Sequence, residues 1–266
     1  MRRVVFNKKG GVGKSTITCN LAAISANSGK KTLVVDLDPQ CNSSQYLLGD
    51  DAGKPAKTIA DYFEGLLALL TGTPIEICIR PTQFENLDIL AAGPQLSDLH
   101  SKLEARYKMY KLKGALDSLT QYANVFIDTP PALNFYTKSA LIAGERCLIP
   151  FDCDDFSKRA LYDLIGNVRE MQEDHNPDLQ VEGIVVNQFQ ARAKLPQRLV
   201  QELKDDGLPV IEAYLSSSVK IRESHDLSKP MIHLDPKHKL SQEFTALFEA
   251  INSKWLLVGY MRPWIL

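Results

Sequence analysis

The chain has almost equal numbers of positive and negative side chains. It therefore has no overall positive charge with which to attract nucleic acid. Its 31 lysines and arginines nearly balance its 32 aspartates and glutamates, so that 266 residues carry a net charge of −1. Nucleic-acid-binding proteins usually show a strongly basic balance. Any DNA binding must therefore depend on a local basic patch, and dimerisation is one way to complete such a patch.

Paired cysteines, a leader segment and long apolar runs are also missing. The cysteines include no C-x-x-C pair, which argues against a zinc site or a disulfide framework and favours buried free thiols. No apolar run reaches the roughly 18 residues that a membrane-spanning helix needs, and no secretory signal opens the chain. We therefore expect a cytoplasmic protein. The five cysteines are Cys19, Cys41, Cys78, Cys147 and Cys153.

The composition favours one folded domain. The chain is 44% hydrophobic and has no Pro/Gly/Ser-rich linker, internal repeat or low-complexity tract, and its length suffices to bury a substantial core. We assign residues 1–254 to a single α/β domain. Residues 255–266 form an apolar C-terminal tail whose role the sequence does not reveal.

The most informative segment is Lys8–Thr16 (KKGGVGKST), which directly follows the apolar run Val4–Phe6. In an ordinary phosphate-binding loop, G-x-x-x-x-G-K-[ST], backbone N–H groups surround phosphate oxygens, the lysine contacts the β and γ phosphates, and the hydroxyl binds Mg²⁺. Here Lys8 replaces the first glycine, which leaves the deviant Walker A pattern K-G-G-x-G-K-[ST] with a second lysine, Lys9. The predicted nucleotide-binding residues are Lys9, Gly10, Gly11, Val12, Gly13, Lys14, Ser15 and Thr16.

Strand-like and helix-like segments alternate along the rest of the chain. A helix predicted directly after the loop would point its positive N-terminal end at the phosphates. The alternation predicts a doubly wound, mostly parallel sheet with helices on both faces, whose ligands bind at the carboxyl ends of the strands. We predict strands at Val4–Phe6, Thr32–Val35, Leu87–Leu90, Val125–Ile127, Cys147–Pro150 and Val181–Val186, and helices at Ser15–Ser28, Gln95–Gln121, Phe135–Ala143, Phe156–Glu173, Pro196–Asp205 and Leu240–Ser253.

Carboxylates follow two of these strands. Asp36 and Asp38 leave the strand Thr32–Val35 on the same side, so that one can position the metal while the other orients an attacking water. The alternative is that they cap a turn before a helix. Asp128 ends the strand Val125–Ile127 in the form of a Walker B motif, where a carboxylate holds Mg²⁺ directly or through water. The predicted metal site therefore comprises Ser15, Asp36 and Asp128.

Two further features follow the strand Val181–Val186. The Asn187 amide has both a donor and an acceptor, which suits the N6/N7 edge of adenine, although an asparagine there can also cap a turn. Basic residues come next, and the alternative for any one of them is a solvated charged surface. Those that we single out for contacts with DNA phosphates are Arg192, Lys220 and Arg222, with Lys194 and Arg198 nearby.

Taken in this order, the motifs resemble those of the ParA/MinD family of deviant Walker A ATPases, and within it the small Soj-like partition ATPases, from Val4 to about Phe248. The resemblance implies a P-loop NTPase fold that uses ATP and Mg²⁺. It makes Asp38 the hydrolytic aspartate, Asp36 its partner near the metal, and Asn187 the adenine-binding residue. In the family's segment N-V-R-L-S-E-A-P, Lys220 falls on the arginine, and the chain departs from the final Ala-Pro at His225.

The resemblance also implies a dimeric mechanism. ATP would join two subunits face to face, and Lys9 of each would reach the phosphates of the other and stabilise transition-state charge, as an arginine finger does. The catalytic residues would be Lys9, Lys14 and Asp38. The dimer would bind nonspecific double-stranded DNA of the nucleoid, and a ParB-like protein or cargo adaptor would stimulate hydrolysis, so that a plasmid, chromosome or protein cargo is segregated or positioned.

Related functions remain as alternatives. A MinD-like membrane-cycling ATPase would share the nucleotide motifs and carry a basic amphipathic C-terminal helix, whereas Gly259 and Pro263 interrupt the tail here and Arg262 is its one basic residue after Lys254. We therefore do not expect membrane binding. An iron-protein relative needs cysteines that Thr129–Ala143 lacks. We expect neither the additional sequence of an amide synthase nor a helix-turn-helix domain ahead of the loop.

Overall fold

The computed structural model describes residues 1–54, 56–68, 72–153 and 158–257. Its centre is a seven-stranded sheet with the order β3-β4-β2-β5-β1-β6-β7, in which β3 alone runs antiparallel to its neighbour. The predicted mostly parallel sheet is confirmed, and β3 is an edge strand that the sequence pattern did not reveal. The strands are β1 (Arg2–Val5), β2 (Thr32–Asp36), β3 (Ile79–Pro81), β4 (Leu87–Leu90), β5 (Asn124–Asp128), β6 (Arg146–Asp152) and β7 (Gln180–Asn187).

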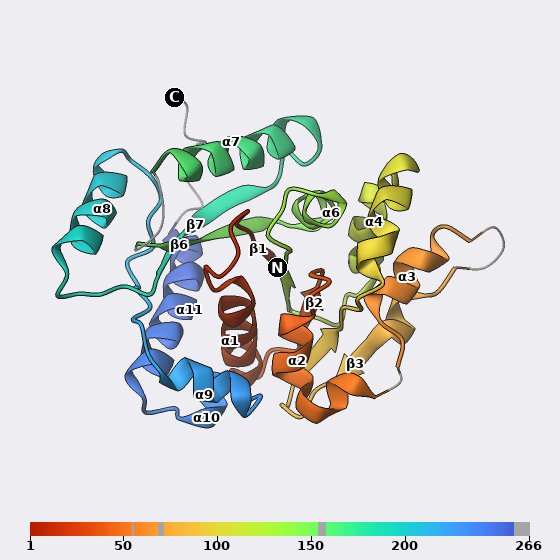
Figure 1. Cartoon of the computed structure of the whole chain (residues 1–266), viewed down its shortest axis with the longest axis horizontal. Coiled ribbons are helices and arrows are strands. Elements are labelled where there is room, and N and C mark those ends of the chain that lie inside the picture. The colour runs from red at the N-terminus through yellow and green to blue at the C-terminus, as the bar shows by residue number, and fades with distance from the viewer. Residues whose placement is uncertain (55, 69–71, 154–157, 258–266) are drawn as a thin grey trace.

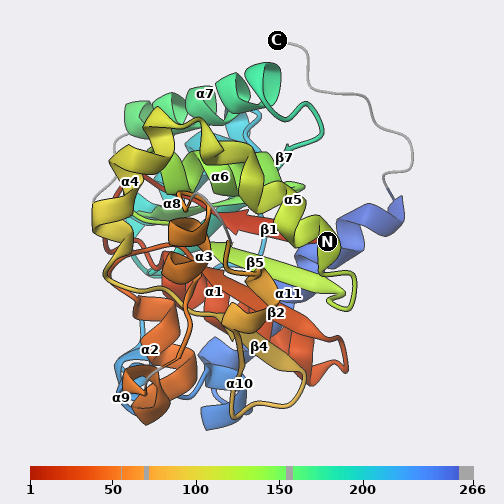
Figure 2. The same cartoon turned by 90° about the vertical axis from the view of Figure 1, so that its right-hand side faces the viewer.

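Helices cover both faces of this sheet, as predicted (Figures 1 and 2). One face packs against α3 (Ile59–Gly65), α4 (Leu96–Ala105), α5 (Lys111–Ser118), α6 (Phe135–Ala143), α7 (Lys158–Asp174) and α8 (Lys194–Asp205). The other packs against α1 (Lys14–Asn27), α2 (Asn42–Leu48), α9 (Lys220–Asp226), α10 (Met231–Leu234) and α11 (Lys239–Leu257).

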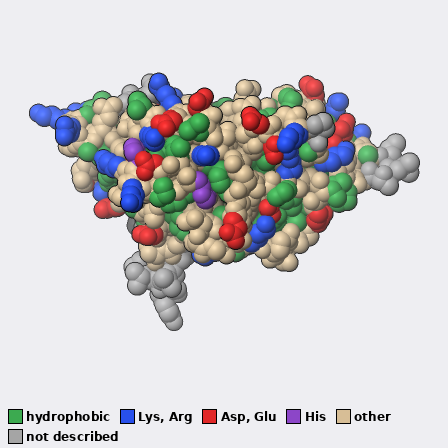
Figure 3. All heavy atoms as spheres, turned by 90° about the horizontal axis from the view of Figure 1, so that it is seen from below, with side chains coloured by type: hydrophobic (Ala, Val, Ile, Leu, Met, Phe, Trp, Pro, Cys, Tyr) green, Lys and Arg blue, Asp and Glu red, His purple; other side chains and the backbone are tan. Residues whose placement is uncertain are grey.

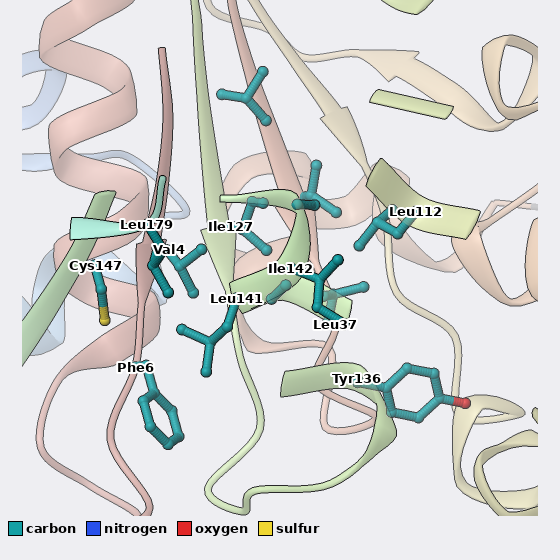
Figure 4. Packing of buried hydrophobic residues seen from close by; sticks show 14 of the residues in the cluster. Val4, Phe6, Leu37, Leu112, Ile127, Tyr136, Leu141, Ile142, Cys147 and Leu179 are labelled. Atoms are coloured by element: carbon teal, nitrogen blue, oxygen red, sulfur yellow. The ribbon is translucent and has the colours of Figure 1, made fainter. Parts of the chain in front are cut away.

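Two apolar clusters, one on each face, hold these layers together. On the α6 face, Val4 and Ile127 of adjacent strands lie in one cluster with Leu141 and Ile142 of α6, all fully buried (Figure 4). Burying each such side chain contributes roughly 1.5–3 kcal/mol relative to leaving it exposed. Successive side chains of β1 point to opposite faces of the sheet, so Val4 packs in this cluster and Val5 packs in the other. Packing therefore fixes both faces of the strand that precedes the phosphate loop.

The prediction of one helix over Gln95–Gln121 is wrong, because the chain turns between α4 and α5. Tyr107 has a φ of 52°, and a short 3₁₀ turn follows it at Lys108–Tyr110. The apolar positions explain the break: Leu103 and Leu112 are nine residues apart, about two and a half helical turns, and would point to opposite sides of a continuous helix. The turn lets both reach the core, where both are fully buried.

The last helix of the domain ends after residue 254, the position at which we expected the domain to end. Helix α11 continues through Leu257, so the first three residues of the predicted tail extend a helix of the domain. Residues 258–266 lie outside the described residues, as do residues 154–157 at the start of the helix predicted over Phe156–Glu173. Along the described chain, no helix combines the length and apolar character needed to cross a membrane.

Candidate functional site

The predicted motifs converge at the carboxyl ends of three neighbouring strands. Strand β1, which runs into the phosphate loop, lies between β5 and β6, and Val5 stands beside Asp128 of β5. On the other side of β5, Asp36 of β2 stands beside the same Asp128. Parallel pairing therefore places the loop, the D-x-D-P-Q segment and the Walker B aspartate at one edge of the sheet.

The phosphate loop is anchored at its start by Asn7, a buried residue that sequence reasoning did not single out. Its Nδ2 donates to the Pro150 carbonyl at 2.8 Å, and its Oδ1 accepts from the Lys9 backbone N–H at 2.9 Å. The loop then passes through two left-handed glycines, Gly11 with φ 78° and Gly13 with φ 89°. Only the place of Asn7 in the sequence could have indicated this role, because Asn7 is the polar residue between an apolar strand and a glycine-rich loop.

Lys14 is the first residue of α1 and is almost fully buried. Its Nζ donates to the Lys9 carbonyl at 2.9 Å, so that the ammonium lies against the loop's own backbone. Burial lowers the pKa of Lys14, and the negative charges of Asp128 and Asp38 oppose this shift. A buried ammonium that donates to a main-chain carbonyl is suited to phosphate oxygens, which would replace the carbonyl as its acceptors.

Asp128 has the features of a metal ligand. It is fully buried, its Oδ2 accepts from the Ser43 hydroxyl at 2.7 Å, and its Oδ1 has no hydrogen-bond partner among the described residues. Burial raises its pKa to about 6, and the nearby hydroxyls of Ser15 and Ser43 oppose this shift. A buried carboxylate oxygen without a partner is costly, and a divalent cation held jointly with the Ser15 hydroxyl would satisfy it. The residues at this position therefore fit Mg²⁺.

Asp36 and Asp38 both shape the turn that follows β2. Asp36 accepts hydrogen bonds on both oxygens, from the Asp38 N–H at 3.1 Å and from the Ser44 N–H and hydroxyl at 2.8 and 2.7 Å. Burial and the charge of Asp128 raise its pKa to about 8. Asp38 accepts from the Gln40 N–H at 3.0 Å. These bonds correspond to the turn-capping alternative, and the metal role of Asp36 and the hydrolytic role of Asp38 stay predictions.

Asn187 lies against the phosphate loop, at the end of β7. Its Nδ2 donates to the Val12 carbonyl at 3.0 Å, so its side chain bridges the last strand and the loop. Its predicted contact with adenine stays a prediction. The bond to Val12 adds a role in fixing the loop, which no sequence motif indicated.

Because Asn187 packs so closely, Gly13→Ala should disable the loop. A Cβ on Gly13 would lie 2.4 Å from Asn187 Nδ2, and the residue has a φ of 89°. We expect thermal stability to fall, since backbone strain of this kind costs about 1–3 kcal/mol, and ATP affinity to drop about tenfold or more, because the new Cβ would displace Asn187 from the phosphate loop. Isothermal titration with ATP and Mg²⁺ and thermal unfolding measure both effects.

Gly29→Ala is the matched control for this substitution. Gly29 has a similar φ of 82°, but a Cβ there would meet nothing within 4 Å. It should therefore lose stability through backbone strain while keeping its ATP affinity. Equal ATP affinities for the two variants would contradict the specific contact with Asn187.

The predicted DNA-binding residues lie on two separate elements. Arg192 is exposed in the loop before α8, whereas Lys220 and Arg222 belong to α9. Lys220 is partly exposed and pairs with Glu223, with 2.9 Å between Nζ and Oε1. Helices α8 and α9 stand apart in both cartoon views (Figures 1 and 2), and on the face drawn in Figure 3 basic and acidic side chains are interspersed. The loop that carries Arg192 is connected to the segment before α9, because Phe189 pairs with Ser216, four residues before Lys220.

A histidine that sequence reasoning noted only as a departure from the family pattern lies beside the phosphate-binding helix. His225 Nε2 is 2.9 Å from Thr16 Oγ1, and its ring stacks on Tyr46 with 4.1 Å between centroids. No local motif predicts this contact, because the two hydrogen-bonded residues are 209 positions apart in the chain.

Comparison with known proteins gives consistent matches. The protein family described as "AAA domain" matches residues 3–181. The chromosome partitioning protein ParA of Myxococcus xanthus is 33% identical over 91% of this chain and 84% of its own length. The sporulation initiation inhibitor protein Soj of Bacillus subtilis is 31% identical over 93% of this chain and 96% of its own length.

Solved structures share the fold. The septum site-determining protein MinD of Pyrococcus horikoshii, complexed with Mg-ADP, has a TM-score of 0.75 at 25% identity and covers 98% of this chain and 99% of its own. Cobyrinic acid a,c-diamide synthase of Mycobacterium smegmatis, with bound ADP and magnesium, has a TM-score of 0.79 at 23% identity and covers 98% and 97%. At that identity the second likeness shows the fold alone.

Proposed function

The chain belongs to the ParA/Soj family of P-loop ATPases, and from this premise we propose that it binds and hydrolyses ATP with Mg²⁺ and cycles between a monomer and an ATP-bound dimer. The observation that carries the proposal is that a buried Lys14 ammonium lies at the same edge of the sheet as an Asp128 carboxylate oxygen that has no hydrogen-bond partner among the described residues. The Lys14 ammonium can bind phosphate oxygens and the Asp128 carboxylate can bind Mg²⁺, so the two groups match the charges of a Mg²⁺–triphosphate.

Different residues would bind the phosphates, the Mg²⁺ ion and the attacking water. The loop N–H groups and Lys14 bind the phosphates, while Ser15 and Asp128 hold Mg²⁺, with Asp36 supporting the turn beside it. The cation, when bound, neutralises charge on the phosphate oxygens. Asp38 orients the attacking water. Solved relatives with the same fold contain Mg-ADP, or ADP and magnesium, which supports this choice of ligands.

Lys9 completes the site from the partner subunit. Its backbone is held by Asn7 and by Lys14, at its N–H and its carbonyl respectively, so its side chain can change partner while the loop keeps its shape. A cation that arrives only in the dimer makes hydrolysis depend on dimerisation. We therefore expect the monomer to be nearly inactive, and a ParB-like or cargo-adaptor protein to stimulate the dimer.

The ATP dimer would then bind nonspecific double-stranded DNA and localise to the nucleoid. Relatives named as chromosome partitioning proteins support this function. Since the chain has a net charge of −1 and these residues offer few phosphate contacts in one protomer, pairing Arg192, Lys220 and Arg222 of two subunits is what would create an adequate patch.

Lys220→Glu should remove DNA binding and leave ATP-dependent dimerisation intact. Wild-type binding should require ATP, show no sequence preference, and weaken with salt by a log–log slope of about −0.9 for each neutralised phosphate. Lys30→Glu is the control, because it makes the same charge change at an exposed position at the opposite edge of the sheet, before β2. Fluorescence anisotropy with two unrelated duplexes measures the affinity.

Sedimentation of the same samples with anionic liposomes tests the rival membrane-cycling function. Our proposal predicts no ATP-dependent cosedimentation. Liposome binding that is lost on deleting residues 255–266, together with no DNA binding, would contradict the DNA-binding proposal and support the rival.

A further inference from the structure

A connected set of buried and partly buried polar groups joins the phosphate-binding helix α1 to the short helix α9. Thr16 Oγ1 and His225 Nε2 are 2.9 Å apart, and Thr16 lies in the first turn of α1, next to the predicted metal ligand Ser15. The contact therefore starts inside the nucleotide site. It ends on the helix that carries Lys220 and Arg222.

The same set of groups includes α2. The His225 ring stacks on Tyr46 with an interplanar angle of 19°, and the Tyr46 hydroxyl is hydrogen-bonded to Ser224 Oγ and to Asn20 Nδ2. Ser224 and Asn20 are fully buried, and Tyr46 is 2% exposed. Buried polar networks are stable only when their partners are all satisfied, so α9 is fixed to α1 and α2 in one particular arrangement.

The Thr16 hydroxyl has a single proton, and this makes the contact sensitive to the nucleotide. It can donate that proton to His225 or to a phosphate oxygen, but not to both. Burial lowers the pKa of His225 and so favours the neutral ring, which can accept at Nε2 or donate from it according to its tautomer. A phosphate that takes the Thr16 proton would therefore require His225 to change tautomer or to separate from Thr16.

We propose that His225 is a positioning residue that couples nucleotide binding at Thr16 to the placement of α9 and its basic residues. This inference rests on the proposed ATP-dependent DNA binding and explains how the nucleotide would control it within one subunit. With Lys220 on the arginine, His225 stands where the family pattern has proline, so the coupling is a property of this chain's own residues.

The test compares the gain in DNA affinity on replacing ADP with ATP in wild type, His225→Phe and His225→Gln. Phenylalanine keeps a ring over Tyr46 but removes the hydrogen bond to Thr16, whereas glutamine keeps a polar atom near the position of Nε2. We expect the ATP-dependent gain to fall about fivefold or more in His225→Phe, as for the loss of one coupled hydrogen bond. Glutamine should recover most of it.

His233→Phe is the matched control. His233 also stacks on an aromatic ring, that of Phe84, with 4.5 Å between centroids, and burial lowers its pKa as well. Its Nε2 has no hydrogen-bond partner among the described residues. This variant should keep the full ATP-dependent gain, and thermal unfolding should show whether any variant is destabilised.

Hydrogen exchange of the α9 amides in the wild-type protein provides a readout that needs no variant. Protection over residues 220–227 should change on addition of ATP and Mg²⁺. An unchanged α9, or a His225→Phe protein with the full wild-type gain, would overturn the inference. If the wild type binds no DNA, the proposed function fails, whereas the exchange result still decides whether α9 responds to ATP.

Discussion

Replacing Lys9 with alanine should reduce ATP hydrolysis by about 10³-fold or more, the range of effect known for a cation supplied from a partner subunit. ATP binding by the monomer should stay close to wild type. The contacts that fix the loop at this position use the Lys9 main chain, whose N–H donates to Asn7 and whose carbonyl accepts from Lys14. An alanine keeps both. Size-exclusion chromatography with ATP and Mg²⁺, combined with a phosphate-release assay, separates binding, dimerisation and hydrolysis.

Lys8→Ala is the control for this experiment. Lys8 is the adjacent lysine, and its Nζ donates to Asn167 Oδ1 at 2.7 Å on the exposed surface of the same protomer. It should dimerise and hydrolyse ATP as the wild type does. A Lys9→Ala protein that also dimerises and hydrolyses normally would show that the cross-subunit role assigned to Lys9 is wrong.

The centre of the fold was predictable because its signals are local and strong. A β-rich run followed by a glycine loop and a helix fixes the strand–loop–helix unit, and the other apolar runs fix the parallel strands. Asp36, Asp128 and the loop are far apart in sequence, but parallel strands bring their carboxyl ends together. The sequence therefore predicted which residues meet at the site, although not the contacts that they make.

The turn-rich parts of the chain were less predictable. Helices α2, α3 and α9 have seven residues each, too few to show a clear helical period. The break at Tyr107 lets Leu112 pack in the same core cluster as Leu103, and that packing is visible only in the folded structure. A nine-residue spacing between Leu103 and Leu112 was nevertheless a readable sign that one helix could not bury both.

Side chains that complete the site through distant contacts were the hardest to predict. Ser43 and Ser44 belong to no motif, yet they hold Asp128 and Asp36. Their position just after D-x-D-P-Q was the available signal. Asn187 illustrates the opposite case, because its amide was assigned to adenine from its position after a strand, and in the structure it also holds the Val12 carbonyl.

Replacing Asp38 should slow hydrolysis without preventing ATP binding or dimerisation. A residue that orients or deprotonates the attacking water contributes about 10²–10⁴-fold to the rate, so Asp38→Ala should accumulate as an ATP-bound dimer. Lys14→Ala, in contrast, should lose nucleotide binding altogether, because we assign its buried ammonium to the phosphates bound by its own subunit.

Asp38→Asn isolates the chemical role of Asp38 from its structural one. The Asp38 Oδ1 accepts a hydrogen bond from the Gln40 N–H at 3.0 Å, and an asparagine can keep that bond while it loses the carboxylate charge. If Asp38 acts on water, the alanine and asparagine variants should both form stable ATP dimers and both hydrolyse slowly. An asparagine variant with the wild-type rate would mean that Asp38 only shapes the turn, and the hydrolytic residue would then have to be sought elsewhere at this edge of the sheet.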